Sequence, residues 1–395
     1  MRRFRIGSAF GIPIQLDLTF LLVLPLFAWI IGSQVTPTVD LLNQFGGNLD
    51  AAVLTTDLLP WLLGITAAIG LFAGVVLHEL GHSLIATRFG YPIESITLWL
   101  FGGIAQLEEM PENWKQEFTI AIAGPIVSVL VGTVSLIGFL LVPSTNTATA
   151  SLQFVLGYLA LMNIALAGFN MLPGFPMDGG RILRALLARN KPYARATEIA
   201  AEVGKGFAIL LGLFGLFPPF NPLLIGLAFF IYIGAEGESR QTVMRAAFEG
   251  ITVADVMTTA DRVTAVDPKM SVQELIETMF RERHTGYPVE RSDRIVGLVT
   301  LDDARSVREV ERDAYTVGDV MTTELIAVGP DDDVMTALTE LEQNSVGRLV
   351  VLDEDDEFRG LLTRSDIMTA LTIIKSNPNY KADDEGEATV FEPQP

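Results

Sequence analysis

The stretch Ala73-Gly-Val-Val-Leu-His-Glu-Leu-Gly-His-Ser-Leu-Ile-Ala86 places three ionisable side chains, His78, Glu79 and His82, inside an apolar run. On an α-helix, residues four positions apart lie one above the other, so both imidazoles would face the same way, with Cβ atoms about 6 Å apart. Two imidazole nitrogens in that geometry can bind one Zn²⁺, and Glu79 could accept a proton from a water molecule at the metal. Because the chain has only three histidines, a chance match to this H-E-x-x-H pattern is rare.

The alternative is that both histidines are buried residues whose nitrogens bond to neighbouring carbonyl groups. The surrounding run, however, is apolar enough to be a membrane helix. Ionisable residues inside a membrane are energetically costly and usually serve a function. Three of them on one helix therefore favour a metal site, with one Zn²⁺ per chain.

The composition divides the chain into an apolar part and an acidic part. Half of the 395 residues are hydrophobic, yet the formal net charge is −20. From residue 250 onward, acidic residues outnumber basic ones about two to one, which indicates a separate soluble domain. This acidic excess argues against nucleic-acid binding and suits a high-salt cytoplasm, where screening weakens the repulsion between carboxylates. The chain contains no cysteine, so nitrogen and oxygen must supply any metal ligands.

The apolar part predicts a polytopic α-helical membrane domain over residues 1–236, followed by a linker over 237–250. Six spanning segments are expected, at 15–33, 60–86, 117–142, 151–172, 203–217 and 219–236. We interpret the first as a retained membrane segment, because it lacks a clear small-residue cleavage site. The loops at 34–59, 143–150 and near 218 contain no Lys or Arg, whereas the opposite loops contain many. The positive-inside rule therefore places both termini and the acidic domain in the cytoplasm of a cell-membrane protein.

Residues 95–107, between the second and third segments, alternate in polarity and are rich in β-branched side chains. This pattern predicts a small membrane-associated β-hairpin, with Gly102-Gly103 as a turn or bulge. Such a hairpin could present an edge to an unwound substrate peptide, which would bind as an added strand. It could equally be an interfacial loop without a role in substrate binding, and the sequence leaves both interpretations open.

The fourth segment is interrupted at Asn170-Met-Leu-Pro-Gly-Phe-Pro-Met-Asp178. Pro173 and Pro176 lack backbone donors, and nearby glycines permit tight turns. Asp178 would then stand at the start of a short helix, where it could be only an N-cap. Irregular backbone at membrane depth normally lines a cavity, however, and two histidines still need a third protein ligand. We therefore expect Asp178 to complete the zinc site.

With these motifs identified, residues 1–236 resemble the site-2 proteases, a family of intramembrane zinc metalloproteases. The resemblance is carried by His78-Glu-Leu-Gly-His82, Phe101-Gly-Gly-Ile-Ala-Gln-Leu-Glu108, Ala123-Gly-Pro125, Asn170-Met-Leu-Pro173 and Met177-Asp-Gly-Gly-Arg181. It implies that His78, His82 and Asp178 bind zinc and that Glu79 is the catalytic base. It also implies that Asn170 positions the substrate or stabilises the oxyanion, and that the substrate is a transmembrane protein in the lipid bilayer.

An internal repeat organises the acidic part. Val253-Ala-Asp-Val-Met-Thr-Thr259 returns as Val317-Gly-Asp-Val-Met-Thr-Thr323, and Gly297-Leu-Val-Thr-Leu-Asp-Asp303 returns as Gly360-Leu-Leu-Thr-Arg-Ser-Asp366. A period of about 63 residues predicts two α/β modules packed as a pair, at 251–310 and 311–374. The acidic tail at 375–395 is expected to be disordered.

These two modules resemble tandem CBS domains. The resemblance implies an adenine nucleotide held by Thr300 with Asp303 and by Thr363 with Asp366, and it allows a homodimer through the pair. A threonine three residues before an acid is also a helix capping box, so the same residues have a purely structural explanation. The sequence leaves both explanations open.

Two classes of function are consistent with these observations. The first is a zinc metalloendopeptidase that cleaves peptide bonds within or near transmembrane segments and is modulated by the CBS pair. The second is a non-catalytic CBS-gated channel or transporter whose metal site is structural. Glu79 favours the enzyme, because a structural zinc site has no need of a base.

Overall fold

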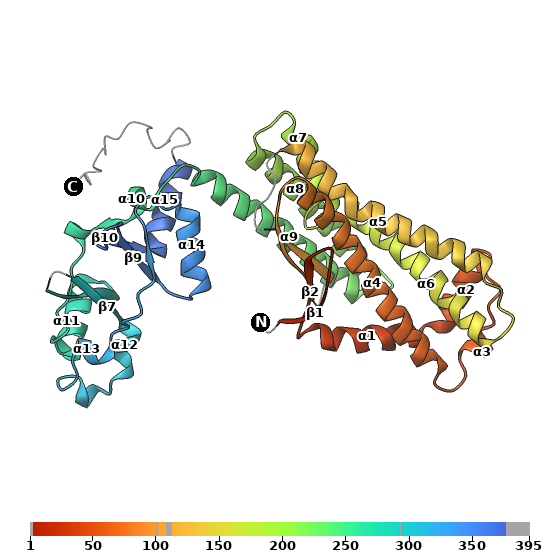
Figure 1. The fold of residues 1–395 in the computed structure, drawn as a ribbon, viewed down its shortest axis with the longest axis horizontal. Helices are drawn as coiled ribbons and strands as arrows, with labels where there is room; N and C mark the ends of the chain where they lie inside the picture. Colours follow the sequence, from red (N-terminus) through yellow and green to blue (C-terminus); the bar gives the residue numbers. More distant parts are fainter. Residues whose placement is uncertain (1–2, 100–101, 108–112, 293, 377–395) are drawn as a thin grey trace. The chain divides into compact units, whose positions relative to one another are not determined.

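The computed structural model describes residues 3–99, 102–107, 113–292 and 294–376. Two compact units make up the chain, Met1–Thr242 and Val243–Pro395. The helices of the first unit are α1 (Phe20–Ser33), α2 (Val35–Gln44), α3 (Ala51–Leu54), α4 (Leu59–Arg88), α5 (Trp114–Leu141), α6 (Thr147–Asn170), α7 (Asp178–Ala188), α8 (Tyr193–Leu216) and α9 (Pro222–Ala247), the last of which continues into the second unit. The long helices α4, α5 and α6 lie side by side (Figure 1).

The described residues contain five helices that could span a membrane, and a sixth span is possible, which agrees with the predicted polytopic fold. Among the described helices, α4, α5, α6, α8 and α9 are long and apolar enough to cross a membrane. Helices α1 and α2, bent by 65° at the break between them, together make a sixth candidate. The α-helical polytopic fold class therefore holds for this unit.

The first predicted span begins too early in the chain. Residues 15–17 belong to β2 (Ile12–Asp17), which pairs with β1 (Arg3–Ala9), and α1 starts only at Phe20. Asp17 ends the strand: its Oδ1 accepts hydrogen bonds from Thr19 N at 2.9 Å and from Thr19 Oγ1 at 2.7 Å. The signal for β1 is the alternation of basic and apolar residues from Arg3 onward, which is typical of a strand rather than of a helix flank.

A four-stranded sheet completes the first unit, in the order β1-β2-β3-β4, with β2 and β3 (Ile93–Trp99) parallel and the other pairs antiparallel. It lies against α4, where Ile12 and Ile96 form one buried cluster with Leu80. The expected hairpin is present as β3 and β4 (Gly102–Leu107), and β4 is an edge strand. Gly102 and Gly103 are neither a turn nor a bulge, as predicted, but regularly paired strand residues opposite Trp99 and Leu98. Residues 100 and 101, between the two strands, and Glu108, at the end of the family motif, lie outside the described residues.

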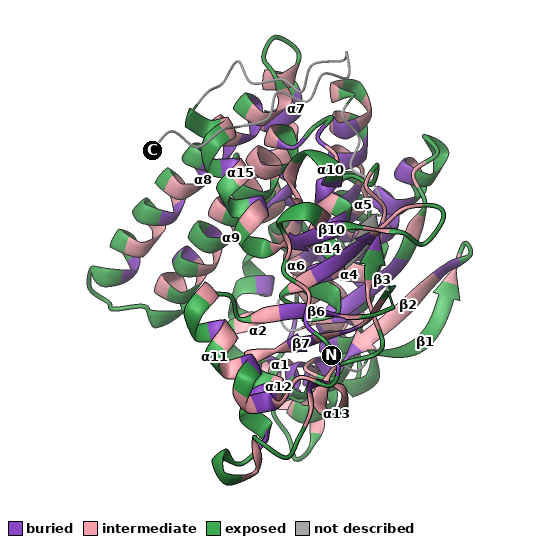
Figure 2. Ribbon diagram, turned by 90° about the vertical axis from the view of Figure 1, so that its left-hand side faces the viewer, coloured by how far each residue is buried: buried purple, intermediate pink, exposed green. Residues whose placement is uncertain are grey.

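Two other predicted segments, 203–217 and 219–236, are shorter than the helices observed there. Helix α8 begins at Tyr193 instead of residue 203, because its early charges stay on exposed positions, as in the ion pair of Arg195 with Glu198. Small buried residues at four-residue spacing (Ala196, Ala200, Gly204 and Ala208) let its other side pack closely, and buried and exposed positions alternate along it (Figure 2). Helix α9 continues through residues 237–247 of the predicted linker, with an i,i+4 ion pair between Glu236 and Arg240.

The second unit contains two small α/β modules. Its helices are α10 (Val253–Val256), α11 (Val272–Glu282), α12 (Leu301–Ser306), α13 (Val317–Val320), α14 (Val334–Gln343) and α15 (Arg364–Ser376), with short 3₁₀ turns η1 (Ala260–Arg262) and η2 (Glu309–Glu311). Its strands are β5 (Thr258–Thr259), β6 (Gly286–Arg291), β7 (Arg294–Thr300), β8 (Ala327–Val328), β9 (Arg348–Leu352) and β10 (Phe358–Thr363). Strands β6 and β7 form one sheet, and the order β5-β10-β9-β8 forms the other.

The two repeats exchange their first turns. Val253, at the start of the first repeat, is buried in the core of the second module with Val334 and Leu349. Val317, at the start of the second repeat, is buried in the core of the first module with Val272. The repeats at 251–310 and 311–374 are therefore interleaved, which makes the pair a single folded body.

Candidate metal centre

Three side chains from two helices converge inside the first unit. His78 and His82 lie one turn apart on α4, and Asp178 is the first residue of α7. Asp178 Oδ2 lies 3.1 Å from His78 Nε2 and 3.2 Å from His82 Nε2, and the two Nε2 atoms are 3.2 Å apart. All three side chains are buried. The structure thus brings the three predicted ligands together, although 100 positions separate His78 from Asp178.

Hydrogen bonds on the far side of each imidazole determine which nitrogen faces the cluster. His82 Nδ1 lies 2.7 Å from the carbonyl oxygen of Ile120, and His78 Nδ1 lies 2.8 Å from Ser128 Oγ. A carbonyl oxygen can only accept, so His82 Nδ1 carries a proton and donates it, and in the neutral imidazole the Nε2 lone pair is then directed at the cluster. Both partners belong to α5. A second nitrogen held in this way is the usual arrangement of metal-binding histidines.

The spacing of the three atoms fits a zinc ion. Tetrahedral Zn–N and Zn–O bonds of about 2.0–2.2 Å separate the ligand atoms by about 3.3 Å. The separations between the three atoms are 3.1, 3.2 and 3.2 Å. Imidazole lone pairs and a carboxylate oxygen at such distances repel one another unless a metal cation or a shared proton lies among them. Two nitrogens and one oxygen also leave a fourth position free for water or substrate.

Helix α5 packs closely against both imidazole rings at Gly124. A Cβ atom at Gly124 would overlap His82 Nε2 and would lie 2.7 Å from His78 Nε2. Only glycine therefore lets α5 approach this near. Ile120, Gly124 and Ser128 follow one another at four-residue spacing, so a single face of α5 supports the histidine pair.

Glu79 lies beside the cluster on the same helix and is half-buried. Strand β4 approaches it at Gly103, where an added Cβ would lie only 2.6 Å from Glu79 Cγ. The glycine in β4 is therefore required by packing against Glu79 rather than by a turn, which is why the sequence-based turn was misplaced. The edge strand and the predicted base are thus immediate neighbours.

Asp178 follows the break between α6 and α7. The N-cap of α7 is Met177, and Asp178 is the first helical residue, with its carboxylate directed at the histidines. The capping explanation considered for Asp178 therefore does not apply, although the helix dipole still favours a carboxylate at this end. Asn170 ends α6 immediately before the break and is half-buried.

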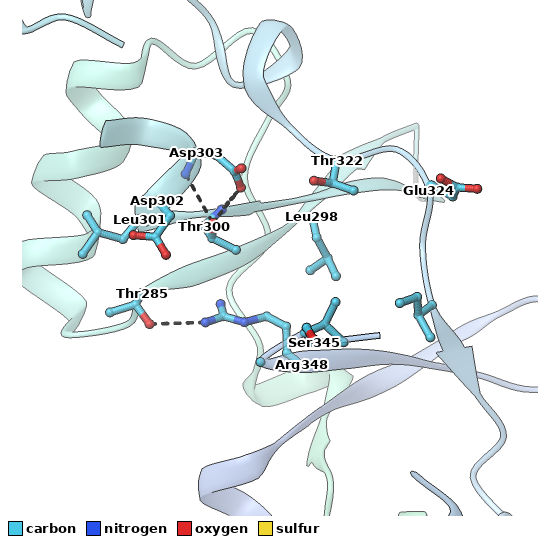
Figure 3. A pocket seen from close by; sticks show the side chains of 13 residues that line it. Thr285, Leu298, Thr300, Leu301, Asp302, Asp303, Thr322, Glu324, Ser345 and Arg348 are labelled. Carbon is cyan, nitrogen blue, oxygen red and sulfur yellow. Dashed lines mark hydrogen bonds between the residues drawn. The ribbon is translucent and has the colours of Figure 1, made fainter. Parts of the chain in front are cut away.

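The predicted nucleotide residues lie in the second unit. Thr300 and Asp303 line a pocket of about 500 Å³ (Figure 3), and both also form the capping box of α12. Thr363 and Asp366 make the same pair of hydrogen bonds at the start of α15, where Asp366 Oδ2 lies 2.7 Å from Thr363 Oγ1. The capping function of these residues is therefore present in both modules.

Sequence reasoning missed the residues that orient the histidines. Ser128 and the Ile120 carbonyl lie on α5, and their contacts depend on how α4 packs against α5, which no local pattern encodes. Gly124 was noted only within the Ala123-Gly-Pro125 motif. The available signal was the spacing of Ile120, Gly124 and Ser128 on one helix face, which places one polar residue in an apolar run.

A polytopic helical fold with a buried histidine–histidine–aspartate cluster and an adjacent glutamate defines a membrane protein of the metal-dependent hydrolase type. Comparison with known proteins agrees. The family profile of peptidase family M50 matches residues 66–146 and 135–211, and the CBS domain profile matches residues 253–309 and 317–373.

Similar proteins cover nearly the whole chain. A zinc metalloprotease of Methanocaldococcus jannaschii is 34% identical over 95% of this chain and 98% of its own length. Rip3 of Mycobacterium tuberculosis is 32% identical over 94% of this chain and 93% of its own length. The solved structure of a site-2 protease from Methanocaldococcus jannaschii is 36% identical and covers 60% of this chain and 96% of that chain, with a TM-score of 0.40.

The chain belongs to peptidase family M50 and carries a pair of CBS domains. The resemblance to site-2 proteases with tandem CBS domains is thereby confirmed.

Proposed function

We propose that the chain is an intramembrane zinc metalloprotease that hydrolyses peptide bonds within or near transmembrane segments of membrane proteins. In this proposal His78, His82 and Asp178 bind one zinc ion, and Glu79 is the general base. The observation that carries it is the convergence of two Nε2 atoms and one carboxylate oxygen at 3.1–3.2 Å, with the opposite imidazole nitrogens held by α5.

A zinc ion bound by these residues would polarise the scissile carbonyl group and lower the pKa of water at the site toward neutrality. Glu79, next to His78 on α4, then accepts a proton from the attacking water and later delivers it to the leaving amine. The Ile120 carbonyl and Ser128 keep the imidazoles oriented throughout. Asn170, at the end of α6, is proposed to position the substrate or to stabilise the oxyanion.

The edge strand β4 offers the substrate a route to Glu79. The active site needs an extended peptide, because an intact helix hides its peptide bonds in internal hydrogen bonds. Strand β4 is an edge strand, and its Gly103 lies against Glu79. We therefore favour the strand-addition alternative over an interfacial loop: an unwound substrate segment pairs with β4 and passes in front of the base.

The test of this function is cleavage of a transmembrane model substrate by reconstituted protein. Glu79→Gln should retain zinc but lose about 10²–10⁴-fold of the cleavage rate, because only the proton transfer is removed. Activity of this variant near that of the parent would reject the assigned base. A variant and a parent that both bind zinc without cleaving anything would favour the channel or transporter alternative.

The distribution of basic residues supports a cytoplasmic location of both termini and of the CBS pair. Because the chain has no cysteine, single introduced cysteines report topology cleanly. A membrane-impermeant maleimide added to intact cells should label Thr145→Cys and leave Glu354→Cys unlabelled. The acidic excess supports a high-salt cytoplasm, and added KCl should then raise the thermal stability of the protein.

The pocket at Thr300 supports nucleotide binding by the CBS pair. Its volume of about 500 Å³ lies in the range of small-molecule sites. Arg348 crosses it, with Nη2 3.2 Å from Thr285 Oγ1 (Figure 3), and burial lowers the pKa of its guanidinium group. Arg348 Nε has no hydrogen-bond partner among the described residues, so a phosphate group would satisfy it.

Calorimetry of the full-length protein with AMP, ATP and S-adenosylmethionine tests this part of the proposal. Thr300→Val should weaken binding, whereas Thr316→Val removes an equivalent capping box that does not line the pocket. No heat change with any of the three ligands would reject nucleotide binding at this pocket. Dimerisation would then be the better explanation of the role of the CBS pair. Phe280 of α11 agrees with this explanation, because its side chain is 87% exposed and a second copy of the chain would cover it.

A further inference from the structure

Arg184, on the helix that Asp178 begins, is the most deeply buried basic side chain among the described residues. Only 1% of its side chain is exposed. A charged group at this depth is costly unless several partners compensate it. Arg184 lies six positions after Asp178 on α7, about 9 Å along the helix axis. It is thus a fixed point on the same rigid element that carries the third predicted metal ligand.

The partners of Arg184 come from four other segments. Its Nε and Nη2 lie 2.6 and 2.5 Å from Glu117 Oε1 on α5, and its Nη1 lies 2.6 Å from Glu238 Oε1 on α9. The guanidinium also stacks 4.8 Å from the rings of Phe175, in the break before α7, and Tyr193, the first residue of α8. One guanidinium therefore joins α7 to α5, α8, α9 and the preceding loop.

The link to α5 has a direct geometric consequence for the metal centre. Glu117 lies on α5 one turn before Ile120 and two turns before Gly124, the residues that hold and wall the histidine pair. The ion pair of Glu117 with Arg184 therefore connects α5, which supports the histidines, directly to α7, which carries the aspartate. A shift of α7 of a few tenths of an ångström would move Asp178 Oδ2 outside the ±0.2 Å tolerance of a zinc bond.

We propose that Arg184 is a positioning residue for the metal centre, and that Glu238 makes this positioning depend on α9. This inference rests on the proposed zinc site. Glu238 lies five positions before Val243, where the CBS-containing unit begins, on a helix that continues unbroken to Ala247. A displacement of α9 would accordingly pull on Arg184 and, through α7, change the position of the Asp178 carboxylate.

The experiment compares Glu238→Gln with Glu236→Gln in the full-length protein. Both remove a carboxylate from α9, but Glu236 pairs with Lys205 at 3.1 Å and with Arg240 at 2.8 Å, and has no ion pair with α7. Cobalt absorption spectra and zinc affinity are measured for each, together with thermal stability. Glu238→Gln should alter the cobalt spectrum and weaken zinc binding about 10- to 100-fold, the range found for residues that orient metal ligands. Glu236→Gln should match the parent protein in both.

A second variant separates positioning from general stability. Arg184→Lys keeps the charge but loses the forked geometry, so it should reproduce the spectral change of Glu238→Gln. Phe139→Leu, in the separate buried cluster with Leu54 and Phe154, lowers stability without touching α7 and should leave the spectrum unchanged. With a parent that binds metal, an unaltered spectrum and zinc affinity in Glu238→Gln would overturn the dependence on α9, and an unaltered spectrum in Arg184→Lys would overturn the positioning role of Arg184. A parent that binds no zinc or cobalt would overturn the proposed function and this inference with it.

Discussion

Replacing Gly124 by alanine is a direct test of the metal geometry, because it adds one methyl group against the histidine pair. The new Cβ would overlap His82 Nε2 and lie 2.6 Å from His82 Cε1 and 2.7 Å from His78 Nε2. Ordinary van der Waals contact begins near 3.4 Å, so the His78 ring must retreat by about 0.7 Å and the His82 ring by more than that. That displacement is several times the ±0.2 Å tolerance of a zinc bond.

The fold should survive the same change. Alanine in a helix interior is about 1 kcal/mol more favourable than glycine, which offsets part of the strain in α5. We therefore expect Gly124→Ala to remain folded in detergent, with a melting temperature close to that of the parent, while its zinc affinity falls by about 100-fold or more. Zinc content by mass spectrometry and competition with a chelator measure the affinity, and circular dichroism measures the fold.

Gly168→Ala in α6 is the matched control. A Cβ at Gly168 meets nothing within 4 Å, so this variant gains helix propensity without a clash and should bind zinc as the parent does. Normal zinc affinity in Gly124→Ala would refute the reasoning, because it would mean that α5 does not press on the imidazole nitrogens. Equal losses in both variants would point to a general effect of the substitution.

Three further predictions address single contacts. Ser128→Ala removes the partner of His78 Nδ1 and should lower zinc affinity about tenfold, measured by chelator competition; unchanged affinity would show that His78 needs no support from α5. Gly103→Ala places a methyl group against Glu79 and should lower kcat about 100-fold while zinc content stays at the parent level, and a loss of zinc would contradict that separation. Hydrogen bonds from Thr316 lower the pKa of Asp319 in the folded protein. The stability that this carboxylate contributes is therefore present above its unfolded pKa of about 3.9, and it is lost as the pH falls through the lower folded pKa. Asp319→Asn should accordingly lower the melting temperature of the soluble unit at pH 7 but not near pH 2, and an equal deficit at both would remove the capping box as its cause.

The parts of the fold that the sequence predicted are those encoded by long periodic or apolar runs. Helices α4 to α6 and the repeat in the acidic part fall in this group, because their signals extend over many residues. The strands at the N-terminus were missed because Arg3 and Arg5 were interpreted as the flank of a membrane segment. The start of α8 was placed too late, since its charged residues hide a buried stripe of small ones on the opposite face.

The candidate site divides in the same way. His78, Glu79 and His82 lie within five consecutive residues of one helix, so their arrangement follows from helix geometry alone. Asp178 could be placed near them only through the argument about broken helices and the family resemblance. Ser128, Gly103 and Arg184 depend on contacts between elements distant in the chain, which hydropathy and spacing do not specify.

Zinc-edge X-ray absorption of the purified full-length protein tests the central claim most directly. We predict one zinc ion per chain, with two imidazole nitrogens and one carboxylate oxygen among its ligands at about 2.0–2.2 Å. A zinc ion with fewer than two imidazole ligands, or a spectrum left unchanged by Asp178→Asn, would contradict the account.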